Sequence, residues 1–145
     1  IAIHELSTIK VLLEQNTLVV ACGGGGVPIY RDPALGLEGV DAVVDKDLAA
    51  AVLARELGAE LFMILTDVDA VYTGWGTDEK RAISSMTVAE ADKLAKDGAF
   101  GEGSMGPKVA AATDYVRRTG GRAIITELSK GRAAVQGAGG TEIVP

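Results

Sequence analysis

The sequence has little of several residue types on which common kinds of site depend. Its 145 residues include one cysteine, Cys22, and one histidine, His4. A single cysteine cannot form an internal disulfide, and it is typical of a protein in a reducing cytosol. Neither C-x-x-C nor H-x-x-x-H spacing occurs, so we expect no zinc held by protein side chains. His4 lies close to the start of the chain, and we expect no catalytic role for it.

Long apolar runs and an excess of positive charge are also missing. No stretch approaches 18 consecutive apolar residues, which argues against a membrane-spanning helix, and the first residues contain no apolar signal-peptide segment. The Lys and Arg residues number 14 against 20 Asp and Glu residues, a formal net charge of −6. A broad nucleic-acid surface needs a basic face, so we expect neither nucleic acid nor a membrane as a partner. A local anion site remains compatible with this charge.

What is present is the composition of one soluble globular domain, 48% hydrophobic and 23% charged. Apolar periodicity and turn residues predict helices at 5–14, 47–60, 87–98 and 107–121, strands at 17–22, 61–66, 122–126 and 141–144, strand or hairpin pieces within 27–45, and at most a short helix within 129–137. The strands are apolar on both faces and alternate with helices. We therefore expect an α/β fold with a mainly parallel sheet, whose ligands bind beyond the carboxyl ends of the strands.

Local signals support the predicted helices. The helix at 47–60 has one apolar stripe, formed by Leu48, Val52, Leu53 and Leu57. Gly58 stands where a C-terminal cap is expected, and Thr87 and Glu90 have the spacing of a capping box. Pro107 is expected at the first position of the helix that follows it.

Four consecutive glycines follow an apolar run in "VVACGGGGVP" (19–28): Gly23, Gly24, Gly25 and Gly26. Each glycine loses more backbone freedom on folding than any other residue, so a run of four suggests a use. The run fits neither G-x-G-x-x-G, because Pro28 or Ile29 stands at the last position, nor the P-loop pattern. We expect a loop whose N–H groups face a phosphate or carboxylate, and the alternative is a tight exit from a strand.

Two lysines are each predicted in the first turn of a helix that follows a loop. Lys46 stands in "VDKDLAAAV", and Lys108 follows the glycine-rich "GSMGP". A cation opposes the helix dipole at this end, so two such lysines suggest convergence on one anion, with Asp47 holding Lys46 in place. The alternative for Lys46 is a solvated lysine that points away, and Asp45 or Asp47 alone could be a helix cap.

The stretch "TDVDAVY" (66–72) begins where the strand at 61–66 ends. Alternation would point Asp67 and Asp69 the same way, toward a nucleotide or metal, and a turn with Asx hydrogen bonds is an equally good interpretation. Trp75 in "YTGWGT" is expected in a loop, exposed or loosely packed, and Cys22 is expected to pack as a small apolar residue.

Taken in order, these stretches resemble one family. The stretches "VVACGGGGVP", "GVDAVVDKDLAAAVLARELGAE", "LFMILTDVDAVY", "GSMGPKVAAA" and "GGRAIIT" look like the carbamate kinases of the amino-acid kinase superfamily, over nearly the whole chain. The resemblance implies a three-layer αβα sandwich and phosphoryl transfer between carbamoyl phosphate and ADP, giving ATP and carbamate. It also implies Mg2+ bound with ATP or ADP rather than at a dedicated protein site, a cytoplasmic homodimer, and a place in arginine or purine-derived catabolism.

The resemblance also assigns roles to residues. Lys46 and Lys108 correspond to the lysines that stabilise the transferring phosphoryl group, and Asp47 to the carboxylate that orients them. The glycines at 23–26 correspond to a loop beside the substrate. Six residues correspond to the walls of the nucleotide pocket: Thr66, Asp67, Asp69, Tyr72, Met105 and Gly106.

The chain departs from the family in two respects. Ala70 stands where many relatives have glycine, which would strain or reshape the turn if that position needs a positive φ. Relatives are about twice as long, so we expect 1–145 to be a single domain, the C-terminal nucleotide-binding part, with the N-terminal substrate half absent. The alternatives are an acetylglutamate or uridylate kinase type of specificity, or a nucleotide-binding module without catalysis.

Overall fold

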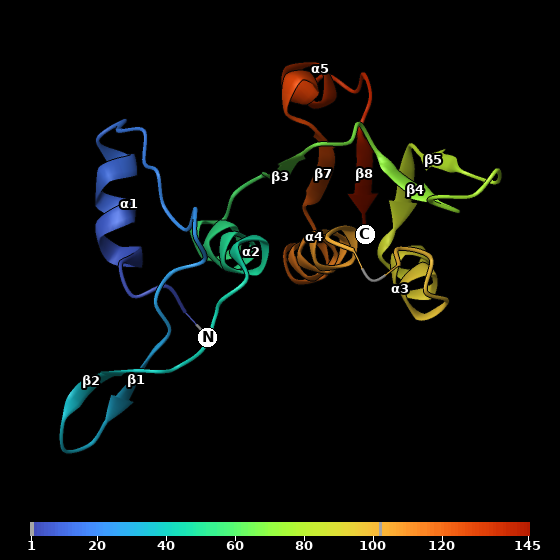
Figure 1. Ribbon diagram of the computed structural model, residues 1–145. Coiled ribbons are helices and arrows are strands. Elements are labelled where there is room, and N and C mark those ends of the chain that lie inside the picture. The colour runs from blue at the N-terminus through green and yellow to red at the C-terminus, as the bar shows by residue number, and fades with distance from the viewer. Residues whose placement is uncertain (1, 102) are drawn as a thin grey trace.

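A four-stranded mixed sheet forms the centre of the computed structural model, which describes residues 2–101 and 103–145 (Figure 1). The strands stand in the order β3 (Leu61–Thr66), β7 (Arg122–Glu127), β8 (Thr141–Val144) and β6 (Ser85–Thr87). β3 pairs with β7 and β8 with β6 in parallel, whereas β7 and β8 run antiparallel. Two of the three pairings are therefore parallel, and the strands predicted at 61–66, 122–126 and 141–144 are confirmed.

Helices cover both faces of this sheet. On one face α4 (Met105–Thr119) packs on β7 and β3, with α2 (Lys46–Leu57) and α3 (Val88–Lys96) beside it and α1 (Leu6–Glu14) beyond α2 (Figure 1). On the other face lie the 3-10 turn η1 (Leu128–Lys130) and α5 (Gly131–Val135), where Gly131 approaches Leu65 and Met63. The α/β class and the layered arrangement predicted from the sequence are confirmed.

The core lies between the sheet and α4. Phe62 and Ile64 of β3 point into it, and the Phe62 ring lies 5.4 Å from that of Tyr115. Tyr115 is fully buried, and its hydroxyl donates a hydrogen bond to the carbonyl of Ala59 just before β3. This contact fixes α4 along the sheet and so positions the start of the helix, where the candidate site lies.

The leucine stripe predicted for α2 is wrong as a core face. Leu48 is 45% exposed, whereas Ala51 is buried in the core and Ala54 packs against it. α2 lies directly against α4, which presents Ala111 and Ala112 as fully buried residues. Small side chains allow two helices to approach closely, so the alanines face the core, while Leu48 turns outward and the other three stripe residues, Val52, Leu53 and Leu57, are half-buried.

The predicted helix ends are mostly confirmed. Gly58 caps α2 with a φ of 66°, and Thr87 and Glu90 form both hydrogen bonds of a capping box at the start of α3. α4 begins at Met105, two residues earlier than predicted, so Pro107 is its third residue. A proline is tolerated there because the first-turn N–H groups have no partner within the helix.

The buried strand predicted at 17–22 is wrong. These residues form no strand, and Leu18 and Val20 are each 92% exposed. β-branched residues favour an extended backbone, but a strand also needs a neighbour to pair with, and no described segment pairs with 17–22. The pieces predicted within 27–45 form an antiparallel hairpin of β1 (Ile29–Asp32) and β2 (Gly36–Gly39), away from the main sheet (Figure 1).

Three short strands were not predicted from the sequence. β4 (Val71–Thr73) and β5 (Arg81–Ile83) form a second hairpin, and β6 follows β5 directly. Each has three residues, too few for alternation to be recognised. Across residues 2–101 and 103–145, none of the helices is long and apolar enough to cross a membrane.

Candidate functional site

The starts of α2 and α4 bring two lysines to one carboxylate. Asp45 caps α2 by accepting hydrogen bonds from the backbone N–H groups of Asp47 and Leu48, each at 2.9 Å. The capping role weighed for Asp45 or Asp47 therefore belongs to Asp45. Asp47 is 8% exposed and is free to turn its side chain toward α4.

Asp47 Oδ2 lies 3.0 Å from Lys108 Nζ and 3.4 Å from Lys46 Nζ. Lys108 is buried, whereas the Lys46 side chain is 54% exposed. Burying an ion pair costs desolvation free energy, so a buried lysine paired with a buried carboxylate contributes little to the stability of the fold and suggests a functional role. Two ammonium groups on one carboxylate leave the cluster with one net positive charge, which suits an anion at this point.

The glycine loop packs against the residues that lead into α2. Gly25 is buried with a φ of 93°, and a Cβ there would lie 2.1 Å from the carbonyl oxygen of Val44. Only glycine allows this approach, which places the loop beside the backbone that carries Lys46. Nothing lies within 4 Å of the positions that a Cβ would take at Gly23 and Gly24.

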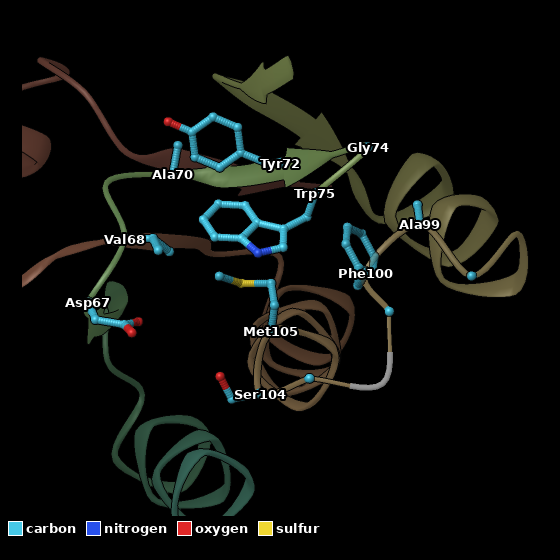
Figure 2. Close-up of a pocket in the computed structure, with 13 residues that line it drawn as sticks. Asp67, Val68, Ala70, Tyr72, Gly74, Trp75, Ala99, Phe100, Ser104 and Met105 are labelled. Carbon is cyan, nitrogen blue, oxygen red and sulfur yellow. The ribbon is translucent and has the colours of Figure 1, made fainter. Parts of the chain in front are cut away.

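A cavity of about 570 Å³ opens in front of the start of α4 (Figure 2). Its walls come from the end of β3, from the β4–β5 hairpin and from the segment between α3 and α4. The lining residues are Asp67, Val68, Ala70, Tyr72, Gly74, Trp75, Gly98, Ala99, Phe100, Gly101, Gly103, Ser104 and Met105. Met105 lies three residues before Lys108 on α4, and residues with this spacing share one helix face. The cavity and the lysine cluster therefore meet at the first turn of α4.

Aromatic and apolar side chains form one end of the cavity. Figure 2 shows the Trp75 indole beside Met105, with Tyr72 and Phe100 around it. The Tyr72 and Trp75 rings meet edge to face with centroids 5.4 Å apart, and Lys80 Nζ lies 4.0 Å from the Trp75 ring centroid. Such a wall suits a flat aromatic ligand group, which aromatic side chains bind by stacking. The sequence analysis expected Trp75 in a loop but did not include it among the site residues. Its position between Gly74 and Gly76 was a usable signal, because flanking glycines allow a loop to present a large ring.

The two aspartates of "TDVDAVY" take different places. β3 ends at Thr66, whose hydroxyl donates to Asp67 Oδ1 at 3.0 Å, and Asp67 lines the cavity. Asp69 instead accepts a hydrogen bond from the Tyr72 hydroxyl at 2.7 Å and lies 3.5 Å from Lys130 Nζ. The expectation that both carboxylates point the same way is wrong, because the chain turns after Thr66 and strand alternation stops there.

The Tyr72 hydrogen bond, assisted by the charge of Lys130, holds the pKa of the Asp69 carboxyl below its usual range. The same hydrogen bond raises the pKa of the Tyr72 hydroxyl. Burial, with a contribution from the charge of Glu5, raises the pKa of the Cys22 thiol. A raised pKa disfavours the reactive thiolate, so Cys22 has no electrostatic sign of a catalytic role.

The structure places two of the remaining predicted nucleotide-site residues at the cavity and one outside it. Tyr72 and Met105 line the cavity, whereas Gly106 does not and instead lines a smaller groove of about 140 Å³ between α3 and α4. Ala70 is buried and does not have a positive φ, so alanine needs no strained backbone there. Where the chain is described, no group of three or more His, Cys, Asp or Glu residues is arranged to hold a metal ion.

Comparison with known families matches residues 1–127 to the amino acid kinase family. The chain belongs to this family. A carbamate kinase from Halobacterium salinarum is 48% identical over 99% of this chain, which spans 46% of that relative. The structure of a carbamate kinase from Giardia lamblia bound to AMP-PNP superposes with a TM-score of 0.94 at 42% identity, covering 99% of this chain and 50% of that one.

A structure with another name, a UMP kinase from Ureaplasma parvum, superposes with a TM-score of 0.63 at 15% identity, covering 97% of this chain and 53% of its own. Identity this low shows a shared fold alone. The chain spans about half the length of the carbamate kinases it matches. The family and the fold expected from the sequence are thus confirmed, and the roles of individual residues stay predictions.

Proposed function

We propose that the chain supplies the nucleotide site and the phosphoryl-stabilising lysines of a carbamate kinase. The observation that carries the proposal is the buried Lys108–Asp47 pair, less than one helical turn along α4 from Met105, which lines the aromatic-walled cavity. Phosphoryl transfer needs little covalent chemistry from a protein, only cations and donors placed around the transferring group. Relatives that carry the name carbamate kinase and a structure that holds AMP-PNP support the same assignment.

In this proposal the nucleotide base lies against Trp75 and Met105, and the phosphates extend toward the first turn of α4. Lys46 and Lys108 neutralise the oxygens of the transferring phosphoryl group, while Asp47 holds both ammonium groups in place. An oxygen of the ADP β-phosphate bonds to the phosphorus of carbamoyl phosphate as the bond from phosphorus to the carbamate oxygen breaks. Carbamate leaves with the bonding electron pair, and the reverse transfer uses the same groups.

The residues at the cavity suit a magnesium ion that arrives on the nucleotide. Mg2+ prefers oxygen ligands and keeps several waters, so a single carboxylate beside the phosphates is sufficient to hold it. Asp67, which lines the cavity, would accept hydrogen bonds from those waters. The ion would supply screening of the phosphate charge. The N–H groups of Gly23 and Gly24, where a Cβ would meet open space, would face the acid substrate, whose other contacts we place in an N-terminal half outside these residues.

The first experiment is a calorimetric titration of the chain with Mg-ADP. We expect binding by the wild type and weaker binding by Lys108→Ala, with Lys93→Ala, an exposed lysine on α3, as the matched control. The loss of one well-placed cation or donor is worth about 3 kcal/mol in the transition state and less in a binary complex. A folded wild-type chain that does not bind Mg-ADP would overturn the proposal.

The second experiment tests transfer. The chain is mixed with the N-terminal half of the Halobacterium salinarum carbamate kinase and assayed for ATP from carbamoyl phosphate and ADP. Acetylglutamate with ATP and UMP with ATP are tested in parallel as the substrates of related specificities. ATP formation from carbamoyl phosphate supports the proposal, and transfer only to acetylglutamate or UMP contradicts it. Nucleotide binding without transfer to any of them identifies a module without catalysis.

A further inference from the structure

The β4–β5 hairpin carries much of the aromatic wall of the cavity, yet it stands outside the main sheet. Within residues 2–101 and 103–145 its two strands pair only with each other, whereas β6, which follows directly, belongs to the four-stranded sheet. The hairpin supplies Tyr72, Gly74 and Trp75 to the cavity. An isolated two-stranded hairpin is marginally stable, so contacts with the rest of the molecule must fix its position.

The hydroxyl of one buried residue ties both strands of this hairpin to the main sheet. Thr141 is the first residue of β8 and is fully buried. Its Oγ1 accepts the N–H of Val71 at 2.7 Å and donates to the carbonyl of Ile83 at 2.5 Å. Val71 and Ile83 face each other in the hairpin register. A single hydroxyl therefore binds both members of one cross-strand pair of the hairpin, because it donates one hydrogen bond and accepts another at the same time.

The backbone beside Thr141 leaves little freedom for this contact to move. Thr141 pairs with Ile125 of β7, and the next residue, Glu142, donates its N–H to the carbonyl of Ser84 at 3.0 Å. Gly140, directly before it, has a φ of 82°, and a Cβ there would lie 3.1 Å from Cβ of Thr126. The Thr141 hydroxyl is thus held by the rigid centre of the sheet.

We propose that Thr141 is a positioning residue for the nucleotide pocket: its hydroxyl sets the position of the β4–β5 hairpin, and thereby of Tyr72 and Trp75 opposite Met105. This inference rests on the proposed function, since it takes the cavity to be the nucleotide site. Thr141 is not among the residues that line the cavity. It acts through the backbone of Val71, next to Tyr72 in the chain.

The decisive variant is Thr141→Val, which keeps the shape of the side chain and removes the hydroxyl. The N–H of Val71 and the carbonyl of Ile83 then lose a buried partner, which favours movement of the hairpin away from β8. Thr113→Val is the matched control, because Thr113 is also buried and its hydroxyl has no hydrogen-bond partner among the described residues. Thr141→Ser restores the hydroxyl without the methyl group.

Trp75 is the only tryptophan, so its fluorescence reports on the hairpin directly. Without ligand, we expect Trp75 quenching by acrylamide to increase in Thr141→Val and to stay at the wild-type level in Thr141→Ser and Thr113→Val. In calorimetric titrations with Mg-ADP, we expect Thr141→Val to bind about tenfold more weakly, and the other two variants within about twofold of the wild type.

Unchanged Trp75 quenching in a folded Thr141→Val variant would overturn the inference, and so would unchanged Mg-ADP affinity. If the wild type does not bind Mg-ADP, the proposed function fails while the quenching still decides whether Thr141 holds the hairpin. If Thr141→Val does not fold, Thr141→Cys takes its place, because a thiol is a weak donor and acceptor of similar size. The same increase in quenching and loss of affinity are expected for it, and wild-type behaviour would contradict the inference.

Discussion

The buried Asp47 carboxylate is the residue on which the candidate site depends. It pairs with Lys108 across the α2–α4 contact and with Lys46 beside it in the chain. Lys108 is almost fully buried, so its ammonium group has exchanged most of its water for this one carboxylate. Asp47 Oδ2 therefore contacts both lysines of the proposed phosphoryl site and also links α2 to α4.

Removing either member of this pair should destabilise the fold more than removing both. Asp47→Asn leaves the buried Lys108 ammonium without a counter-charge, which costs about 3 kcal/mol, whereas Lys108→Met leaves Asp47 paired with the half-exposed Lys46 and should cost less. Replacing both members of a buried ion pair with neutral side chains is often nearly neutral for stability. We expect Asp47→Asn and Lys108→Met each to lower the free energy of unfolding, and the double variant to recover a large part of that loss. Urea denaturation of the four proteins measures the coupling. Additive losses would contradict a direct interaction.

The hydrogen bond from Tyr72 to Asp69 predicts a shift in a titration. Replacing Tyr72 with Phe should raise the Asp69 pKa toward its ordinary value of about 3.9, and Lys130→Met should raise it less. The folded pKa is lowered, so this contribution to stability is complete above about pH 4 and disappears as the pH falls through the folded value. Carboxyl carbon NMR measures the pKa directly, and equal values in the wild type and Tyr72→Phe would contradict the hydrogen bond.

At the scale of elements, the glycine loop and the start of α2 form one packed unit. Gly25 lies against the carbonyl of Val44, Asp45 caps the helix, and Lys46 and Asp47 follow at once. The loop thus contributes to the site before any ligand binds, by setting where α2 begins. The four glycines do not share this role equally, because only Gly25 is pressed against backbone atoms.

This difference predicts unequal effects of two neighbouring substitutions. Gly25→Ala places a Cβ 2.1 Å from a backbone oxygen at a positive φ, so we expect a loss of about 2 kcal/mol or more in unfolding free energy. Gly24→Ala meets open space and should change stability by less than about 0.5 kcal/mol. Thermal melts of both variants test the packing. Equal melting temperatures would show that the loop does not press on Val44 in solution.

At the scale of the whole molecule, the segment before α2 exposes an unusual amount of apolar surface. Of the 16 large hydrophobic side chains exposed among the described residues, nine lie between 18 and 43. Leu18, Val20 and Val43 are the most exposed of them, and they stand on extended segments that pair with no strand. Apolar side chains this exposed gain free energy when another apolar surface covers them, so we expect this segment to bind apolar groups.

We expect this surface to bind a hydrophobic dye and to promote concentration-dependent self-association. Changing Leu18 and Val20 to lysine should lower dye fluorescence and self-association without loss of stability, because both side chains are already exposed. Leu128→Lys, an exposed leucine on the far side of β7, is the control. Dye binding and sedimentation velocity measure the effect. Equal dye fluorescence in the two variants would contradict the prediction that Leu18 and Val20 belong to the dye-binding surface.

Periodicity, caps and turn residues predicted most of the elements, because these signals act between residues three or four apart. The capping box of α3, the glycine cap of α2 and the limits of β3 were all evident before any tertiary contact was known. The lysines, aspartates and glycines of the site could be named for the same reason: their residue types and local spacing carry the chemistry.

Other features depended on contacts between distant parts of the chain. The pairing of Lys108 with Asp47 spans 61 residues, and that of Thr141 with Val71 spans 70. The close approach of α4 decided which face of α2 points inward. The β4–β5 hairpin decided that Trp75 lies beside Met105 in the cavity. The residues at 17–22 have the sequence of a strand but no partner here. The sequence by itself determined which residues could act and where the helices and the strands at 61–66, 122–127 and 141–144 form. Only the packing of these elements decided which side chains meet, because burial and hydrogen bonding are set by neighbours that local sequence does not specify.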